Sequence, residues 1–136
     1  MNRTDLDGLG YRGKTVVLTG GASGMGEAAT RLLGDLGATV HVADIAEPKV
    51  ACASYTHCDL GDRDSVAAAI DTLAKLGPID FLFPIAGVPP HNVGALQCME
   101  INYAGTRRFT EALIPQVRDG GAKLVKYGMV EKKANQ

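Results

Sequence analysis

Tryptophan is absent from this sequence, and its 136 residues include only three phenylalanines and four tyrosines. So few aromatic side chains provide no platform on which the bases of a single-stranded nucleic acid could stack. The formal net charge of -1 gives no electrostatic attraction to a phosphate backbone or an anionic lipid surface. We therefore expect no nucleic-acid partner and no membrane partner.

Long apolar runs are also missing. None approaches the roughly 18–20 residues that span a bilayer, and the first five residues lack the apolar core of a signal peptide. Cysteine is scarce, because Cys52, Cys58 and Cys98 form an odd set without metal-ligand spacing. We interpret them as reduced, mostly buried thiols of a cytoplasmic protein and expect no metal site.

Glycine is plentiful, and one group of glycines stands between a pattern typical of a strand and a pattern typical of a helix. Residues 15–18 are β-branched and apolar, which predicts a strand. Apolar residues at helical spacing predict a helix that reaches residue 36, and its one apolar face consists of Met25, Ala28, Ala29, Leu32, Leu33 and Leu36. Gly20, Gly24 and Gly26 lie where the strand gives way to the helix. A strand, a glycine turn and a helix in this order form the phosphate-binding corner of a dinucleotide fold.

Each of these glycines has a mechanical role in such a corner. Gly20 lets the chain turn sharply as it leaves the strand, and Gly24 leaves no Cβ where a pyrophosphate must approach the backbone. Gly26 lets the helix lie close to the strand. The amide N–H groups at the start of the helix then point at the anion, assisted by the positive end of the helix dipole.

An acidic residue stands at the position that this fold uses for ribose recognition. Residues 38–43 predict a second strand, and Asp44 follows at its carboxyl end, roughly 20 residues past the glycine turn. A carboxylate there can accept hydrogen bonds from the adenosine ribose and would repel a 2′-phosphate. No Arg or Lys stands in the glycine turn or directly after Asp44. We therefore expect NAD rather than NADP.

The rest of the chain continues the alternation of strands and helices. Further strands are expected at about residues 54–58, 79–83 and 123–127, the last of them after a turn at Gly120 and Gly121. A long helix is expected at about 94–117, which Pro115 ends or kinks. This alternation predicts an α/β, Rossmann-like, doubly wound parallel sheet of about five strands in the order 3-2-1-4-5. We expect one incomplete NAD-binding domain over residues 1–136, with a lead-in arm at 1–13 and a frayed tail at 128–136.

These residues together resemble the N-terminal part of a short-chain dehydrogenase/reductase over about residues 14–125, most closely the 3α-hydroxysteroid dehydrogenase/carbonyl reductase type. The string from Thr19 to Gly26, Thr-Gly-x-x-x-Gly-x-Gly, matches the cofactor motif of that family. The resemblance implies that Asp59 and Leu60 form an adenine pocket. It also implies that Ala86 and Gly87 keep the backbone turn beside the cofactor.

The same resemblance gives Asn102 the position of a helix asparagine that the family uses in a proton-relay water network. The alternative is that Asn102 is simply a polar residue on a helix. The residues expected to bind the cofactor are Gly20, Ser23, Gly24, Met25, Gly26, Asp44, Ile45, Asp59, Leu60, Ala86 and Gly87.

The sequence departs from the family pattern after its fourth and fifth strands. Pro84 and Ile85 replace two asparagines, and Gly128 and Met129 stand where serines are expected. Tyr127 has a glutamate four residues later, where the catalytic Tyr-x-x-x-Lys pair has a lysine. A carboxylate there would raise the pKa of the tyrosine instead of lowering it. We therefore expect the chain to be truncated before the catalytic Tyr-x-x-x-Lys pair and to lack the catalytic Ser.

Two functional hypotheses remain open. The first is an NAD(H)-dependent oxidoreductase of alcohol or carbonyl substrates, which keeps only its cofactor-binding half and is inactive alone. The second is a non-enzymatic NAD-binding pseudoenzyme or partner module. A Rossmann-like methyltransferase also uses glycines and an acid, but the Thr-Gly-x-x-x-Gly-x-Gly spacing argues against it. Because no helix follows the fifth strand to cover it, we further expect self-association or pairing with a related subunit.

Overall fold

Five parallel strands form one sheet in the computed structural model, which describes residues 7–123. The strand order is β3-β2-β1-β4-β5, as the sequence predicted. The order reverses its direction between β1 and β4, so a crevice opens beside the carboxyl ends of these strands. The strands are β1 (Thr15–Thr19), β2 (Thr39–Asp44), β3 (Ser54–His57), β4 (Ile79–Pro84) and β5 (Val117–Lys123).

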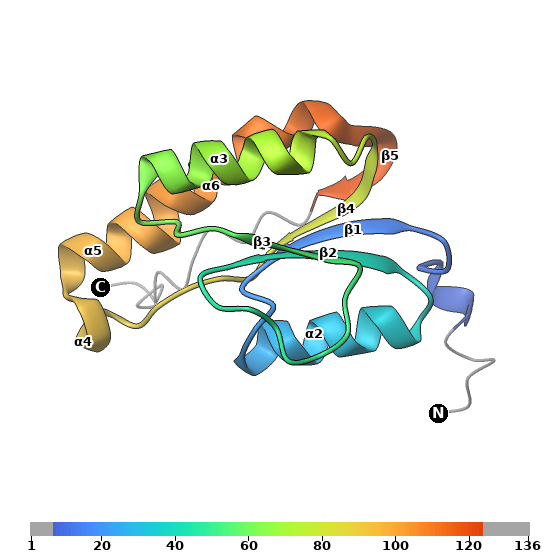
Figure 1. The fold of residues 1–136 in the computed structure, drawn as a ribbon, viewed down its shortest axis with the longest axis horizontal. Coiled ribbons are helices and arrows are strands. Elements are labelled where there is room, and N and C mark those ends of the chain that lie inside the picture. The colour runs from blue at the N-terminus through green and yellow to red at the C-terminus, as the bar shows by residue number, and fades with distance from the viewer. Residues whose placement is uncertain (1–6, 124–136) are drawn as a thin grey trace, which may run out of the picture.

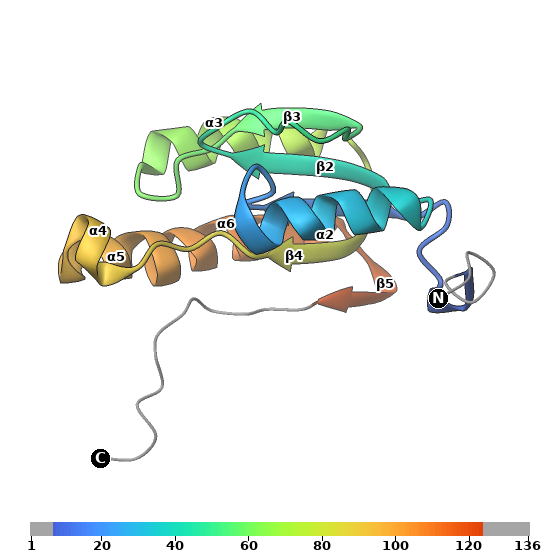
Figure 2. The ribbon, with the colours of Figure 1, turned by 90° about the horizontal axis from the view of Figure 1, so that it is seen from below.

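Helices cover the two faces of the sheet, with α2 on one face and α3 and α6 on the other (Figures 1 and 2). Asp62 caps α3 by accepting the backbone N–H groups of Asp64 and Ser65. The helical segments are η1 (Asp7–Leu9), α2 (Gly24–Asp35), α3 (Arg63–Ala74), α4 (Pro90–Val93), α5 (Ala95–Met99), the π-helical η2 (Glu100–Gly105), α6 (Thr106–Leu113) and η3 (Ile114–Gln116).

The core has one layer on each face of the sheet, and β1 serves both. Val17 packs with Leu82 and Phe109 on the α3 and α6 face, whereas Val16 and Leu18 pack on the α2 face. All three valine and leucine side chains of β1 are fully buried. A strand buried on both faces reads as a continuous apolar run rather than an alternating one, which is the pattern seen in the sequence.

Two expected apolar contacts of α2 are wrong. Met25 and Leu32 were predicted on its buried face, but they are 69% and 52% exposed. The buried stripe instead runs through Gly26, Thr30 and Leu33. These three positions follow the helical spacing of four and three residues, and each neighbour along the chain is rotated by about 100° away from the sheet.

The long helical stretch predicted over 94–117 begins after Gly94, whose φ is 80°, and runs through α5, η2 and α6. It differs from the prediction in the π-helical turn of η2 between the two α-helical parts. Pro115 lies in the short η3 and ends the helical stretch, as expected.

Strand β5 begins at Val117, six residues before its predicted start at Lys123. The glycine pair at 120 and 121, predicted as a turn before the strand, lies within β5, where the pairing with β4 shifts register. A bulge of this kind admits extra residues without ending a strand. The predicted strand residues 124–127 and the tail at 128–136 lie outside the described residues.

No helix in the described range 7–123 is long and apolar enough to cross a membrane. Within the same range, no three His, Cys, Asp or Glu side chains gather as a metal site would require. Of the lead-in arm, residues 7–13 are described. Tyr11 in this part packs its ring 5.0 Å from that of Phe81.

Candidate functional site

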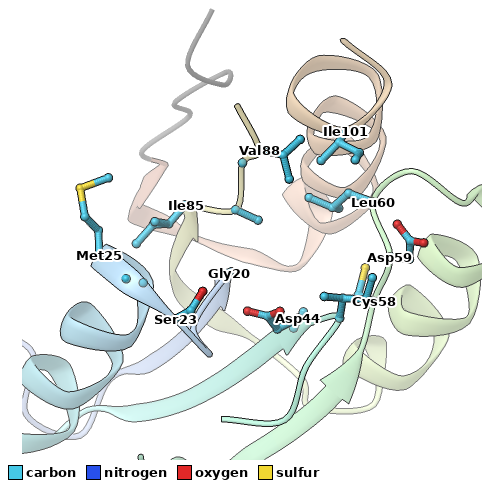
Figure 3. Close-up of a pocket in the computed structure, with 16 residues that line it drawn as sticks. Gly20, Ser23, Met25, Asp44, Cys58, Asp59, Leu60, Ile85, Val88 and Ile101 are labelled. Atoms are coloured by element: carbon cyan, nitrogen blue, oxygen red, sulfur yellow. The ribbon is translucent and has the colours of Figure 1, made fainter. Parts of the chain in front are cut away.

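An open cavity of about 360 Å³ lies at the carboxyl ends of the strands (Figure 3). All eleven residues that the sequence predicted to bind a cofactor line it, although they come from five separate stretches of chain. Their roles in binding stay predictions. The sequence reasoning missed five further lining residues, which have no motif of their own: Ala43, Cys58, Ile85, Val88 and Ile101.

The corner between β1 and α2 is packed too closely for a side chain at two of its glycines. Gly20 has a φ of 76°, and a Cβ there would lie 2.6 Å from the Cα of Ala86. A Cβ on Gly26 would overlap the carbonyl oxygen of Gly20. Gly24, with a φ of 54°, has no protein atom within 4 Å of its Cβ position. The turn is thus closed on its protein side and open on its cavity side.

The start of α2 offers unpartnered donors to that open side. The first N–H groups of any helix have no acceptor within the helix. Ser23 is the N-cap residue, and its side chain makes no capping hydrogen bond to them. Because Ser23 and Met25 both line the cavity, an anion placed there would meet the positive end of the helix dipole.

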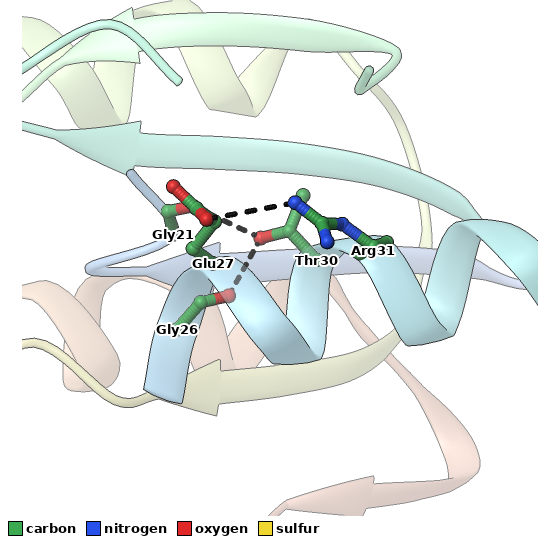
Figure 4. Close-up of polar contacts among 5 residues, drawn as sticks. All are labelled: Gly21, Gly26, Glu27, Thr30 and Arg31. Carbon is green, nitrogen blue, oxygen red and sulfur yellow. Dashed lines mark hydrogen bonds and ion pairs between the residues drawn. The ribbon is translucent and has the colours of Figure 1, made fainter. Parts of the chain in front are cut away.

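Thr30 ties α2 to the glycine turn (Figure 4). Its buried hydroxyl lies 2.9 Å from the carbonyl oxygen of Gly26 and 3.3 Å from that of Gly21. Glu27, the acidic residue of the first helical turn, pairs with Arg31 at 3.6 Å. This pairing offsets the negative charge that Glu27 would otherwise present near a bound anion.

Asp44 is held against the turn by backbone amides. Its Oδ2 accepts the N–H of Ala22 at 2.9 Å, and its Oδ1 accepts the N–H of Ala46 at 3.1 Å. Each carboxylate oxygen can accept more than one hydrogen bond, so capacity remains for a hydroxyl group in the cavity. The bond to Ala22 joins the end of β2 to the glycine turn in one rigid unit.

A third wall of the cavity follows β3. Asp59 donates its N–H to the hydroxyl of Ser65 at 2.8 Å and accepts the N–H of Gly61 at 2.9 Å, which fixes this short loop. Cys58 lines the cavity beside it. Burial, followed by the nearby carboxylates of Asp59 and Asp44, raises the pKa of the Cys58 thiol to about 12. This thiol therefore stays protonated and unreactive at neutral pH.

The turn after β4 is held by Asn102. This side chain is 2% exposed, and its Oδ1 accepts the N–H of Val88 at 2.8 Å while its Nδ2 donates to the carbonyl oxygen of Val88 at 2.8 Å. The Nδ2 also lies 3.2 Å from the sulfur of Cys98. Asn102 does not line the cavity. Its amide therefore supports the turn from behind, which favours a structural role for the side chain.

The family pattern of Asn-Asn-Ala-Gly is thus replaced by a different support. Pro84 and Ile85 provide no side-chain amide, but the N–H of Ala86 donates to the hydroxyl of Thr19 at 3.2 Å. Together with the bonds from Asn102, this bond holds the backbone beside the cavity. Tyr127, Gly128, Met129 and Glu131, the positions compared with the family's catalytic residues, lie outside the described residues.

Comparison with known proteins agrees with this geometry. A family model described as short chain dehydrogenase matches residues 14–130. The chain belongs to the short-chain dehydrogenase family. Among curated short-chain dehydrogenases, 2,5-dichloro-2,5-cyclohexadiene-1,4-diol dehydrogenase of Sphingobium indicum is 40% identical over 111 residues, which cover 69% of this chain and 44% of that protein.

Solved structures give the same family resemblance. The 3-ketoacyl-(acyl-carrier-protein) reductase of Brucella melitensis complexed with NADH has a TM-score of 0.61 at 25% identity, over 78% of this chain and 51% of that one. A blue fluorescent protein from a metagenomic library, in complex with NADPH, has a TM-score of 0.68 at 26% identity, over 83% of this chain and 55% of that one. The chain therefore spans about half the length of these relatives.

Proposed function

We propose that this chain binds NAD(H) in the cavity at the carboxyl ends of β1, β2 and β4. The observation that carries the proposal is the position of Asp44, which the Ala22 N–H fixes beside the glycine turn. The pyrophosphate would bind at the start of α2, beside the open side of Gly24, where no protein atom lies within 4 Å of the Cβ position. The adenosine ribose would then hydrogen-bond to Asp44.

The charge of the cavity favours NAD over NADP. Among the described residues that line it, none is Arg or Lys, whereas Asp44 and Asp59 are both acidic. A 2′-phosphate on the ribose would lie against the Asp44 carboxylate without a cation to neutralise it. The relatives of known structure include one with NADH and one with NADPH, so this preference rests on the residues of this chain.

We further propose that the chain is the cofactor-binding part of an oxidoreductase of alcohol or carbonyl groups. The bound nicotinamide would accept or give up a hydride in such a reaction. The printed sequence contains no Tyr-x-x-x-Lys pair, which in this family moves the accompanying proton. These 136 residues would therefore bind NAD without catalysing hydride transfer alone. The alternative is an NAD-binding module without catalysis.

Two further expectations accompany this function. A cytoplasmic location is supported by Cys52, Cys58 and Cys98, which are all free thiols. Self-association is supported by β5, which lies at one edge of the sheet within residues 7–123, because a strand at an edge offers N–H and C=O groups to another chain. Sedimentation velocity over a range of concentrations tests it, and a monomer at all concentrations would contradict it.

Isothermal titration calorimetry tests the binding proposal. We expect saturable NAD binding by the wild-type chain, about tenfold or more weaker binding by Asp44→Ala because a charge-assisted hydrogen bond is lost, and weaker binding of NADP. Asp71→Ala, at an exposed acid of α3, is the matched control and should bind like the wild type. A folded wild-type chain that does not bind NAD would refute the proposal.

A further inference from the structure

The π-helical segment η2, Glu100–Gly105, lies behind the cavity and contacts two of its walls. We call Asp59–Gly61 the Leu60 wall and Ile85–Val88 the Val88 wall. Figure 3 shows Ile101 of η2 grouped with Leu60 and Val88 on one side of the cavity. A π-helical turn is rare and often occurs at functional sites.

The contact with the Leu60 wall depends on two glycines. Gly105 is buried, and a Cβ on it would overlap the carbonyl oxygen of Leu60 and lie 2.8 Å from its carbonyl carbon. On the opposite side of this contact, a Cβ on Gly61 would lie 3.2 Å from Cγ1 of Ile101. The backbone of η2 therefore lies directly against the backbone of the Leu60 wall.

The contact with the Val88 wall is made by hydrogen bonds. Asn102 binds both the N–H and the C=O of Val88, each at 2.8 Å. The π-helical turn itself is supported by Thr106, whose hydroxyl lies 3.2 Å from the carbonyl oxygen of Ile101. One short segment thus contacts both walls, because Ile101 and Gly105 lie against the Leu60 wall and Asn102 between them binds Val88.

We propose that Gly105 is a positioning residue for the nucleotide pocket. By lacking a side chain, it lets η2 lie against the Leu60 carbonyl and so sets the distance between the Leu60 wall and the Val88 wall. A methyl group at this position would push the two segments apart, because the neighbouring carbonyl group of Leu60 is backbone and cannot rotate away. This inference rests on the proposed binding of NAD to the same cavity.

The first test is calorimetric titration of Gly105→Ala with NAD and with AMP, which carries only the adenosine end of the cofactor. We expect both dissociation constants to rise about tenfold or more at a temperature where the variant remains folded. The control is Gly34→Ala in α2, since a Cβ there meets no atom within 4 Å. A purely structural role would lower the melting temperature of Gly105→Ala without changing either dissociation constant.

A second pair of variants tests the contact even if Gly105→Ala does not fold. The Cβ of Gly61→Ala would lie 3.2 Å from Cγ1 of Ile101 and 3.3 Å from Oδ1 of Asp59. We expect weaker NAD binding that is partly restored in the double variant Gly61→Ala/Ile101→Ala, which removes the contact with Ile101. If Gly105→Ala folds and binds NAD with unchanged affinity, the inference is overturned and the proposed function stands. If Gly105→Ala does not fold, unchanged NAD affinity of Gly61→Ala has the same meaning. Failure of the wild type to bind NAD would overturn the proposed function and this inference with it.

Discussion

The two sides of the cavity are held together by opposite means. At the corner between β1 and α2, backbone lies against backbone, and the Cβ that Gly26 lacks would overlap the Gly20 carbonyl oxygen. At the turn after β4, the side-chain amide of Asn102 fills the space behind Val88 and satisfies its N–H and C=O groups. Adding a Cβ atom should therefore disrupt the packing of the first side, whereas removing the side-chain amide should disrupt that of the second.

Adding a methyl group to the corner should have the largest effect. We expect Gly26→Ala to lower the free energy of unfolding by about 3 kcal/mol, at the upper end of the cost of overpacking, because the overlapping atom is backbone. The displaced helix start should also abolish measurable NAD binding. Urea denaturation and calorimetry measure the two effects.

The control for this variant is the same substitution in an uncrowded part of α2. Gly34→Ala should be neutral or stabilising by about 0.5–1 kcal/mol, because alanine is the better helix former. If Gly26→Ala were as stable as Gly34→Ala and bound NAD equally well, the close packing of the corner would not matter to either property.

Removing the amide from the other side should have an intermediate effect. Asn102→Ala leaves the N–H and C=O of Val88 without their side-chain partners, so we expect a loss of about 2 kcal/mol in the free energy of unfolding. Asn92→Ala, at an exposed position of α4, should change it by less than about 0.5 kcal/mol. Equal stability of the two variants, measured by urea denaturation, would contradict the structural role of Asn102.

We expect the smallest effect on stability from Cys58, which lines the same cavity. Its pKa is raised to about 12, chiefly by burial, from the ordinary thiol value of 9.0. Between these pH values the unfolded chain loses the thiol proton while the folded chain keeps it. The contribution of the Cys58 thiol to the free energy of unfolding is therefore complete below about pH 9 and is lost as the pH rises. The free energy of unfolding should fall by up to about 1.4 kcal/mol per pH unit in this range.

Comparison with Cys58→Ala isolates this contribution from other groups that titrate at alkaline pH. The wild-type chain should lose stability more steeply than the variant between about pH 9 and pH 10.5, as followed by urea denaturation at each pH. Parallel curves for the two proteins would show that the folded environment does not hold the Cys58 proton.

The glycine corner and the strand order could be predicted from the sequence because their determinants are local. Gly20, Gly24 and Gly26 stand within seven residues of one another, and their spacing reflects contacts made inside the same turn. Asp44 could be predicted as part of the same site because it ends the neighbouring strand, and parallel strands bring their carboxyl ends to one edge of the sheet. Alternating strands and helices then restricted the topology to few choices.

The support of the cavity was decided by the tertiary structure. The sequence predicted one continuous helix over 94–117, and nothing in its apolar spacing indicated the π-helical turn at Glu100–Gly105. Asn102 and Val88 are fourteen residues apart, and Gly105 contacts Leu60 from a different layer of the fold. A periodic pattern specifies which face of a helix is buried, but not which backbone groups that face meets. Those contacts depend on how α6, the Leu60 wall and β4 pack together, and only the folded chain brings them into register.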